Sequence, residues 1–140
     1  MLLHIVARGK IGRSPEAELV DRYLNRISWP TRKTELSDSG GAEPAKGSGT
    51  VRILLDERGT ALSSTELARK LESWRDQGKR EARFVIGAAD GHSEAERGEA
   101  DLLLSFGPAT WPHLLVRAML AEQLFRAVSI LAKHPYHRDG

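Results

Sequence analysis

The chain has 140 residues, which suits one domain with a hydrophobic core and is too short for two. Its 21 Lys and Arg residues against 19 Asp and Glu residues give a net charge of +2, too small by itself to predict nucleic-acid binding. The absence of cysteine excludes disulfides, thiolate metal ligands and a cysteine nucleophile. The apolar runs are too short or too interrupted by charge for a signal peptide or membrane span. We therefore expect a single cytoplasmic domain over residues 1–140.

The first third of the chain predicts a strand, a helix and a second strand. Residues 2–7, LLHIVA, form a short apolar run that ends in a glycine-containing loop, as buried strands do. Ser14 and Pro15 then supply an N-cap and a first-position proline for a helix. A strand over residues 32–36 is expected next. The glycines and serines of residues 37–49, SDSGGAEPAKGSG, favour a flexible linker.

The rest of the chain continues the alternation of strand and helix. Residues 50–56, TVRILLD, predict a strand, ERGT a turn, and Ser63 with Glu66 the capping box of a second helix. Two more apolar runs, residues 83–88 and 101–106, predict strands, and a last helix is expected from about Pro112 to Lys133. Strand runs that are apolar on both faces suit a mostly parallel sheet with helices on both faces, so the fold class is α/β.

Two loops at predicted strand ends are candidate ligand-binding segments, because ligands of open α/β sheets usually bind at the carboxyl edge of the strands. For the glycine turn GAADGH, residues 87–92, a plain turn is the favoured explanation over close approach of a ligand, and no phosphate-binding motif is present. The stiff loop FGPATWP, residues 106–112, suits a binding surface, or else Trp111 packs into the core and Pro112 only starts the helix. His113 fits a structural hydrogen-bonding role better than that of a base.

Arg117 lies on the apolar side of the last predicted helix, among Leu120, Ala121, Leu124 and Val128. A buried guanidinium needs a partner. An ion pair inside the chain or at a subunit interface is the simpler explanation, and a ligand or RNA phosphate is the alternative.

Basic and aromatic residues gather at the two ends of the chain. Arg8, Lys10 and Arg13 occur without an acid among the first thirteen residues, and the chain ends in KHPYHRDG, residues 133–140. Such groups can contact phosphates and stack on an unpaired base, or simply form a solvated surface. His134 and His137 lack a third clear ligand, so no metal site is expected.

The series LLDERGT, SSTELA, FVIGAADG and TWPHLLVRAMLAEQLFRAVSILAKHPYHR, within residues 50–138, resembles the SPOUT-class family that methylates N3 of a pseudouridine in 23S ribosomal RNA. The resemblance implies a trefoil-knotted α/β domain that works as a homodimer, uses S-adenosyl-L-methionine and acts on the assembled ribosome. Sequence patterns alone do not indicate a knot.

The resemblance also implies site residues. The cofactor is expected to contact Leu55, Gly87, Ala88, Phe106, Gly107, Pro108, Ala109, Thr110, Trp111 and Pro112. Tyr136, His137 and Arg138, in the tail of one subunit (residues 134–140), are expected to complete the catalytic site beside the cofactor loop of the other, where His137 or His113 removes the N3 proton. Arg8, Lys10, Arg13 and His134 are the expected RNA contacts.

Two departures from the family pattern leave an alternative open. Many members have a glycine where this chain has Ala88, and residues 37–49 are shorter than usual and lack a helix found in relatives. The alternative is a non-catalytic ribosome- or RNA-binding module of the same fold. A small nucleotide-binding enzyme unrelated to RNA is disfavoured by the missing phosphate motifs.

Overall fold

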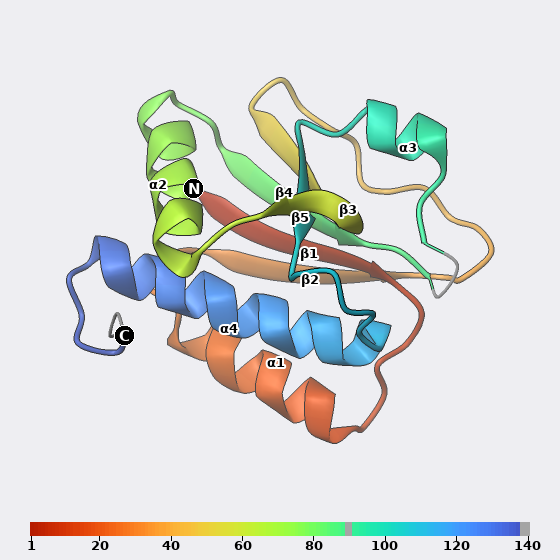
Figure 1. Ribbon diagram of the computed structural model, residues 1–140, viewed down its shortest axis with the longest axis horizontal. Helices are drawn as coiled ribbons and strands as arrows, with labels where there is room; N and C mark the ends of the chain where they lie inside the picture. The colour runs from red at the N-terminus through yellow and green to blue at the C-terminus, as the bar shows by residue number, and fades with distance from the viewer. Residues whose placement is uncertain (89–90, 138–140) are drawn as a thin grey trace.

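The computed structural model describes residues 1–88 and 91–137, which form an α/β fold (Figure 1). All strand pairs are parallel, and the sheet order is β2-β1-β4-β3-β5. The predicted parallel α/β class is therefore confirmed. In chain order the elements are β1 (Leu2–Arg8), α1 (Pro15–Arg26), β2 (Thr31–Leu36), β3 (Thr50–Ala61), α2 (Ser64–Asp76), β4 (Glu81–Ile86), α3 (Glu94–Gly98), β5 (Leu102–Ser105) and α4 (His113–Leu131).

The helix starts follow the predicted capping signals. The Ser14 side chain accepts a hydrogen bond from the Ala17 amide, and Pro15 takes the first helical position of α1. Ser63 and Glu66 form a reciprocal capping box at α2. A second capping box, from Ser93 to Glu96, starts the short α3, which the sequence analysis did not predict.

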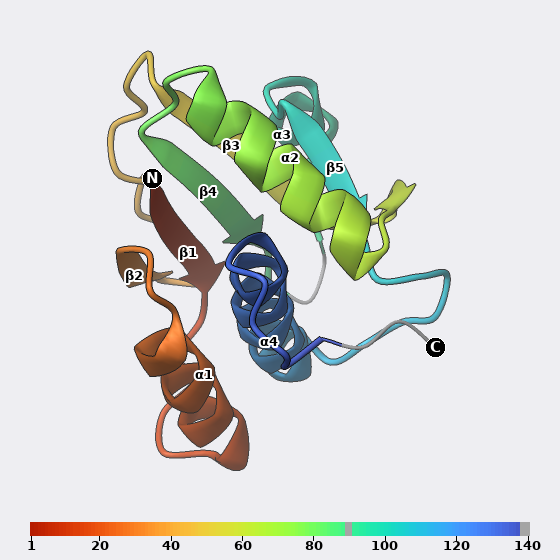
Figure 2. The ribbon, with the colours of Figure 1, turned by 90° about the vertical axis from the view of Figure 1, so that its left-hand side faces the viewer.

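One face of the sheet carries the main core. Helices α1, α2 and α4 lie on this face (Figure 2), and α4 packs against both of the others. Alternate strand residues point toward them, so that Ile5, Phe84 and Ile53 join a buried cluster with Leu120 and Leu124 of α4. This face behaves as the apolar pattern of the strands predicts.

The opposite face has a much smaller apolar cluster. Val6, Val85 and Leu54 are cross-strand partners and form its buried part. The neighbouring row of partners is His4, Arg83 and Arg52, whose residues are only 1%, 2% and 6% exposed. Three polar side chains thus occupy positions that a sheet covered by helices would fill with apolar ones.

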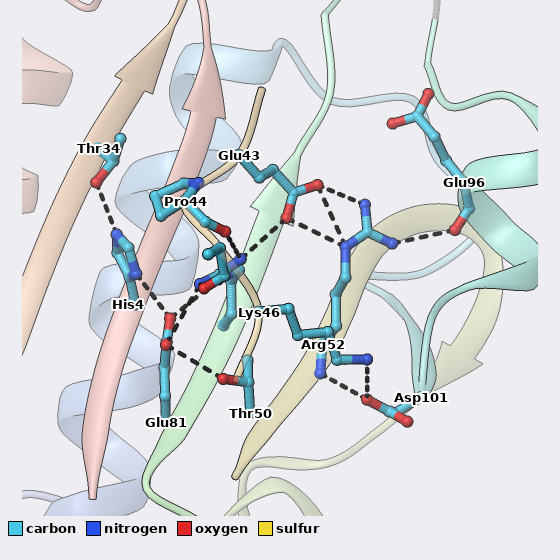
Figure 3. Close-up of polar contacts among 12 residues, drawn as sticks. His4, Thr34, Glu43, Pro44, Lys46, Thr50, Arg52, Glu81, Glu96 and Asp101 are labelled. Carbon is cyan, nitrogen blue, oxygen red and sulfur yellow. Dashed lines mark hydrogen bonds and ion pairs between the residues drawn. The ribbon is translucent and has the colours of Figure 1, made fainter. Parts of the chain in front are cut away.

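The segment 37–49 covers this polar row, as Figure 3 shows. Glu43 Oε2 lies 2.6 Å from Arg52 Nη2, and Arg83 donates to the carbonyls of Pro44 at 2.6 Å and Ala45 at 3.2 Å. Glu81 pairs with both His4 at 2.7 Å and Arg83 at 2.9 Å. The prediction of a flexible linker is wrong, because buried guanidinium groups hold its backbone and the carboxylate of Glu43.

Strand β3 is longer than predicted. Leu55 and Thr60 both pair with Leu104 of β5, so residues 56–59 bulge out and pairing then resumes. The predicted turn at ERGT is present only as this bulge, and the chain does not leave the sheet there. The bulge brings Gly59 against the backbone of β5. A Cβ atom at Gly59 would lie 2.6 Å from the Leu103 carbonyl group, so only glycine fits there.

Helix α4 ends in a Schellman motif. The amide of His134 donates to the Ser129 carbonyl and that of Lys133 to the Ile130 carbonyl, while Lys133 has φ of 58°. This left-handed residue turns the chain back along α4. No helix among the described residues is long and apolar enough to cross a membrane.

Glu43→Gln tests the ionic cover of the second sheet face. Burial alone would raise the pKa of Glu43, but hydrogen bonds and charge from Arg52 and Arg83 outweigh it and lower the pKa from 4.5. We expect the variant to lose about 2 kcal/mol of unfolding free energy at neutral pH. Since the folded pKa is depressed, the loss should shrink as pH falls below 4.5, where the parent carboxylate becomes protonated.

Chemical denaturation across this pH range measures the difference. Lys46→Gln is the control, because its ion pair with Asp101 is exposed and should contribute less than about 0.5 kcal/mol. Equal stability of parent and Glu43→Gln at neutral pH would contradict the anchoring role.

Substitution at Lys133 tests the reversal after α4. Lys133→Val should lower the unfolding free energy by about 1–2 kcal/mol relative to Lys133→Gly, because a β-branched residue is strained at positive φ. Ala132→Val is the control, since Ala132 has φ of −84° and lies in the right-handed region. Thermal unfolding of all three variants should separate Lys133→Val from the other two, and a similar melting temperature for both valine variants would argue against the motif.

Candidate active site

A cavity of about 720 Å³ opens at the bulge in β3, at the carboxyl ends of β4 and β5 and at the first turn of α4. Parallel strands bring their carboxyl ends to one edge, so the loops after β4 and β5 meet the β3 bulge there. The volume lies in the range of small-molecule and cofactor sites. Its walls combine apolar side chains such as Ile86, Leu104 and Val116 with polar groups near the mouth.

The structure brings nearly all predicted cofactor contacts to this cavity. Its lining includes Leu55, Gly87, Ala88, Phe106, Gly107, Ala109, Thr110, Trp111 and Pro112. Pro108 belongs to the same loop but is exposed and does not line the cavity. Trp111 is 42% exposed, so the alternative that it packs into the core is wrong. Its Nε1 donates to the Phe106 carbonyl at 3.4 Å. This hydrogen bond connects the two ends of the loop.

The shape of the loop after β5 depends on two small residues. Ser105 Oγ accepts from the Gly107 amide at 3.0 Å and lies 3.0 Å from the Gly107 carbonyl oxygen. Gly107 has φ of 101°, a conformation that favours glycine. The loop therefore leaves the strand in a tight local turn before the proline-containing segment begins.

Sequence reasoning missed several charged residues at the cavity. Asp56 is 9% exposed, and its Oδ2 lies 2.6 Å from Arg97 Nε. Burial works to raise the pKa of Asp56, but the Arg58 amide and Arg97 lower it overall, so the carboxylate stays ionised. A carboxylate at the last position of the predicted strand was the available signal for Asp56, whereas only the fold brings Arg97 to it.

His92 is a second missed residue. It is 8% exposed, lines the cavity and lies with Nε2 3.1 Å from the Leu55 carbonyl oxygen. Its place after the glycine turn at Gly87 was visible in the sequence, but its burial was not. His113 also lines the cavity, at the first turn of α4.

Arg117 makes an ion pair within the chain, as the simpler prediction held. Its guanidinium lies 2.7 Å from Glu35 Oε2 and donates to the carbonyls of Arg8 and Gly9, both at 2.8 Å. The Ile11 amide donates to the same Glu35 carboxylate. Burial works to raise the pKa of Glu35. The Ile11 amide and Arg117 favour the charged form and lower the pKa overall. Arg117 thus ties the loop after β1 to α4.

The predicted RNA contacts near the N-terminus fall into two groups. Arg8 donates from its guanidinium to the carbonyls of Ser37, Gly40 and Gly41, so it anchors the segment 37–49. Lys10 and Arg13 are exposed on the loop that Arg117 and Glu35 hold. Their contact with RNA stays a prediction.

The predicted catalytic tail packs on α4 of its own chain. Tyr136 contacts Phe125 edge to face with ring centroids 4.5 Å apart, and Arg126 Cζ lies 4.8 Å from the Tyr136 ring centroid. The Tyr136 hydroxyl donates to Glu122 at 3.1 Å. Burial, together with Tyr23 and the Glu122 charge, raises the pKa of Tyr136 to about 12, so the phenol is protonated at neutral pH.

His137 and His134 also have partners near α4. The Nδ1 atom of His137 lies 3.1 Å from Arg126 Nη1, and the Tyr136 amide donates to Nδ1 of His134. The tail residues contact α4 at Glu122, Phe125 and Arg126, whereas the cavity is lined by residues of its first turn. Within one chain the described part of the tail, residues 134–137, does not line the cavity. Arg138 lies outside the described residues.

A groove of about 620 Å³ lies beside the cavity. The two share Leu104, Phe106 and Gly107, so the loop after β5 borders both. Leu19 and Tyr23 of α1 form one side of the groove, and Leu115, Met119 and Glu122 of α4 belong to another. Over residues 1–88 and 91–137, no group of three or more His, Asp or Glu side chains could hold a metal ion.

Comparison with known proteins agrees with this geometry. A family model described as predicted SPOUT methyltransferase matches residues 1–137. A relative from Rhizorhabdus wittichii named ribosomal RNA large subunit methyltransferase H is 69% identical over 140 residues, covering 100% of both chains. A protein of the same name from Zymomonas mobilis is 55% identical over 142 residues, again covering 100% of both.

A solved structure supports the fold independently of close sequence similarity. A probable methylase family protein from Haemophilus influenzae superposes with a TM-score of 0.59 at 13% identity. The match covers 94% of this chain and 66% of that one. The end-to-end match to the family model and to the relatives establishes that this chain belongs to the SPOUT methyltransferase family.

Proposed function

We propose that this protein transfers a methyl group from S-adenosyl-L-methionine to N3 of a pseudouridine in 23S ribosomal RNA. The observation that carries the proposal is the cavity at the strand ends, whose walls include nine of the ten residues that the family resemblance assigns to the cofactor. Relatives that match over their full length are named as methyltransferases of large-subunit ribosomal RNA. We also propose that it acts on the assembled ribosome in the cytoplasm.

The cavity fits the proposed methyl donor in size and chemistry. Apolar walls from Leu55, Phe106 and Trp111 suit an adenine ring, and the main chain at Gly87 and Gly107 leaves polar backbone groups close to the space. When bound, S-adenosyl-L-methionine supplies a methyl group already activated on a sulfonium. The protein therefore has to bind, orient and exclude water, and it needs no nucleophile of its own.

The remaining chemistry concerns the proton on the target nitrogen. Tyr136 cannot accept it at neutral pH, because its pKa is raised and the phenol is already protonated. Tyr136 can instead stack or donate a hydrogen bond. We propose His137 or His113 as the proton acceptor, because imidazole is the side chain that most often serves as a general base. Lys10 and Arg13 are proposed to contact phosphate.

We further propose that the protein acts as a homodimer in which the tail of one subunit serves the cavity of the other. The position of the described tail residues supports this arrangement, since residues 134–137 pack on α4 and do not line the cavity of their own chain. The groove between α1 and α4 borders the cofactor loop and exposes apolar surface at Leu19, Leu115 and Met119 to a second copy.

The alternative of a non-catalytic ribosome- or RNA-binding module rests on Ala88 and on the shortened segment 37–49. Ala88 lines the cavity together with Gly87, and the cavity keeps the volume of a cofactor site. The retained cavity favours the catalytic function, because a module that only binds RNA has no use for it.

Calorimetry and mass spectrometry test the proposed function. We expect the purified protein to bind S-adenosyl-L-methionine, and 23S ribosomal RNA from cells lacking the protein to lose one methyl group on a pseudouridine. Restoring the parental gene should restore that mass. Absence of binding at millimolar cofactor would refute catalysis, whereas cofactor binding without any change in ribosomal RNA mass would refute the substrate.

Mixing two inactive variants tests the shared site. Deletion of residues 134–140 removes the tail, and Gly107→Val forces a side chain onto a residue at φ of 101° in the cofactor loop. Each variant alone should fail to methylate ribosomes. Mixed dimers made by co-expression hold one complete site, so the mixture should recover roughly a quarter of the parental rate.

The tail deletion should also retain cofactor binding, because the cavity lining does not include the tail. Sedimentation of both variants as dimers is the control for assembly. A mixture as inactive as its components would show that tail and cavity act within the same subunit.

A further inference from the structure

His92 occupies an unusual place among the cavity residues. Its side chain is 3% exposed, although it sits in the loop between β4 and α3. The ring nitrogen Nε2 lies 3.1 Å from the Leu55 carbonyl oxygen. A carbonyl only accepts hydrogen bonds, so Nε2 carries a hydrogen and donates it to Leu55. A buried imidazole thus binds the main chain of β3 at the cavity wall.

The carbonyl that His92 binds lies where β3 needs support. Pairing of β3 with β4 ends at Leu54, and the bulge toward β5 begins after Leu55. A backbone carbonyl at such a break requires a partner if it is to stay buried. The imidazole of His92 supplies the hydrogen bond that the sheet does not. It thereby holds Leu55 in place where the regular pairing of β3 stops.

The same ring backs the glycine turn after β4. A Cβ atom on Gly87 would lie 3.0 Å from His92 Cε1 and 3.1 Å from His92 Nδ1. These distances are tighter than ordinary van der Waals contact, so a side chain at Gly87 would require the ring to shift by a few tenths of an ångström. His92 therefore touches both strand ends, Leu55 from β3 and Gly87 from β4, that face the cavity.

Short α3 keeps the ring in this position. Glu96 Oε2 lies 3.5 Å from His92 Nδ1, and Arg52 of β3 donates to the Glu96 carbonyl at 3.1 Å. Arg97 pairs with Asp56 of β3 at 2.6 Å. Two arginine contacts thus fasten α3 to β3 on either side of the residue whose carbonyl His92 binds.

We infer that His92 is a positioning residue for the methyl donor, setting the spacing of Leu55 and Gly87 at the cavity wall through its hydrogen bond and ring contact. The inference rests on the proposed function, because the ligand is the cofactor assigned there. His92 acts through the main chain of Leu55 and the shape of the turn at Gly87. Removing its donor should therefore affect cofactor binding more than the chemical step.

His92→Leu and His92→Gln separate this role from simple packing. Leucine has similar bulk and no donor, and we expect it to weaken S-adenosyl-L-methionine binding roughly 5- to 30-fold by calorimetry. Glutamine places an amide N–H near the position of Nε2 and should bring the affinity back to within about threefold of the parent. In methylation assays the leucine variant should raise the cofactor KM while kcat at saturating cofactor stays nearly constant.

His4→Leu is the matched control. His4 is the other buried histidine of the described chain, 1% exposed, and it pairs with Glu81 and Thr34 in the ionic row of the second sheet face. Its loss should lower the melting temperature yet leave the cofactor affinity unchanged within about twofold. Equal affinity of folded His92→Leu and parent would overturn the inference.

A measurement on the parent protein covers the case in which His92→Leu does not fold. Nitrogen-15 NMR of the imidazoles should show His92 with hydrogen on Nε2, and S-adenosyl-L-homocysteine should shift its resonances while His4 stays unchanged. Unshifted His92 resonances in a protein that binds the cofactor would refute the positioning role. A parent protein that binds no cofactor would instead refute the proposed function.

Discussion

All five strands run in the same direction, and this single constraint creates the site. Because the bulge in β3 and the carboxyl ends of β4 and β5 lie at one edge, Leu55, Gly87 and Phe106 reach one cavity although they are far apart in sequence. The last strand leads through a stiff loop into α4, whose first turn closes the cavity at His113 and Val116. The sheet direction therefore accounts for both the position of the cavity and the variety of loops that line it.

The two faces of the sheet are stabilised by different physics. Helices α1, α2 and α4 bury apolar side chains on one face, where non-directional hydrophobic contact suffices. The other face places His4, Arg83 and Arg52 in one cross-strand row and covers them with an extended segment. Charged groups in such a place need specific partners, so Glu43, Glu81 and backbone carbonyls fix the path of residues 37–49.

The same principle of buried polar contacts organises the region around the site. Arg117 holds the loop after β1 through Glu35 and two backbone carbonyls, which presents Lys10 and Arg13 at the surface. The Schellman motif at Lys133 turns the tail back along α4, where Tyr136 packs on Phe125. His92 and α3 support the cavity wall from the second face. In these places side-chain contacts fix segments of backbone that lie outside the sheet and the helices.

Local sequence patterns predicted the parts of the fold that depend on neighbours in the chain. The caps at Ser14 and Ser63, the order of strands and helices, and the parallel sheet follow from hydrogen bonds and apolar periodicity within a few residues. Family resemblance supplied nine of the residues that line the cavity, because its motifs lie in the segments that meet there. Arg117 was also identified as needing a partner from its place on an apolar helix face.

Only the tertiary structure decided which distant groups pair. The segment 37–49 looked flexible by composition, but Arg52 and Arg83, neither adjacent to it in sequence, anchor it. His92, Asp56 and Arg97 became cavity residues because the fold brings α3 against β3, and the partner of Arg117 proved to be Glu35, 82 residues away. Short-range patterns record what one segment prefers, whereas a buried charge or donor is satisfied by whichever group the sheet and helices bring within hydrogen-bonding distance.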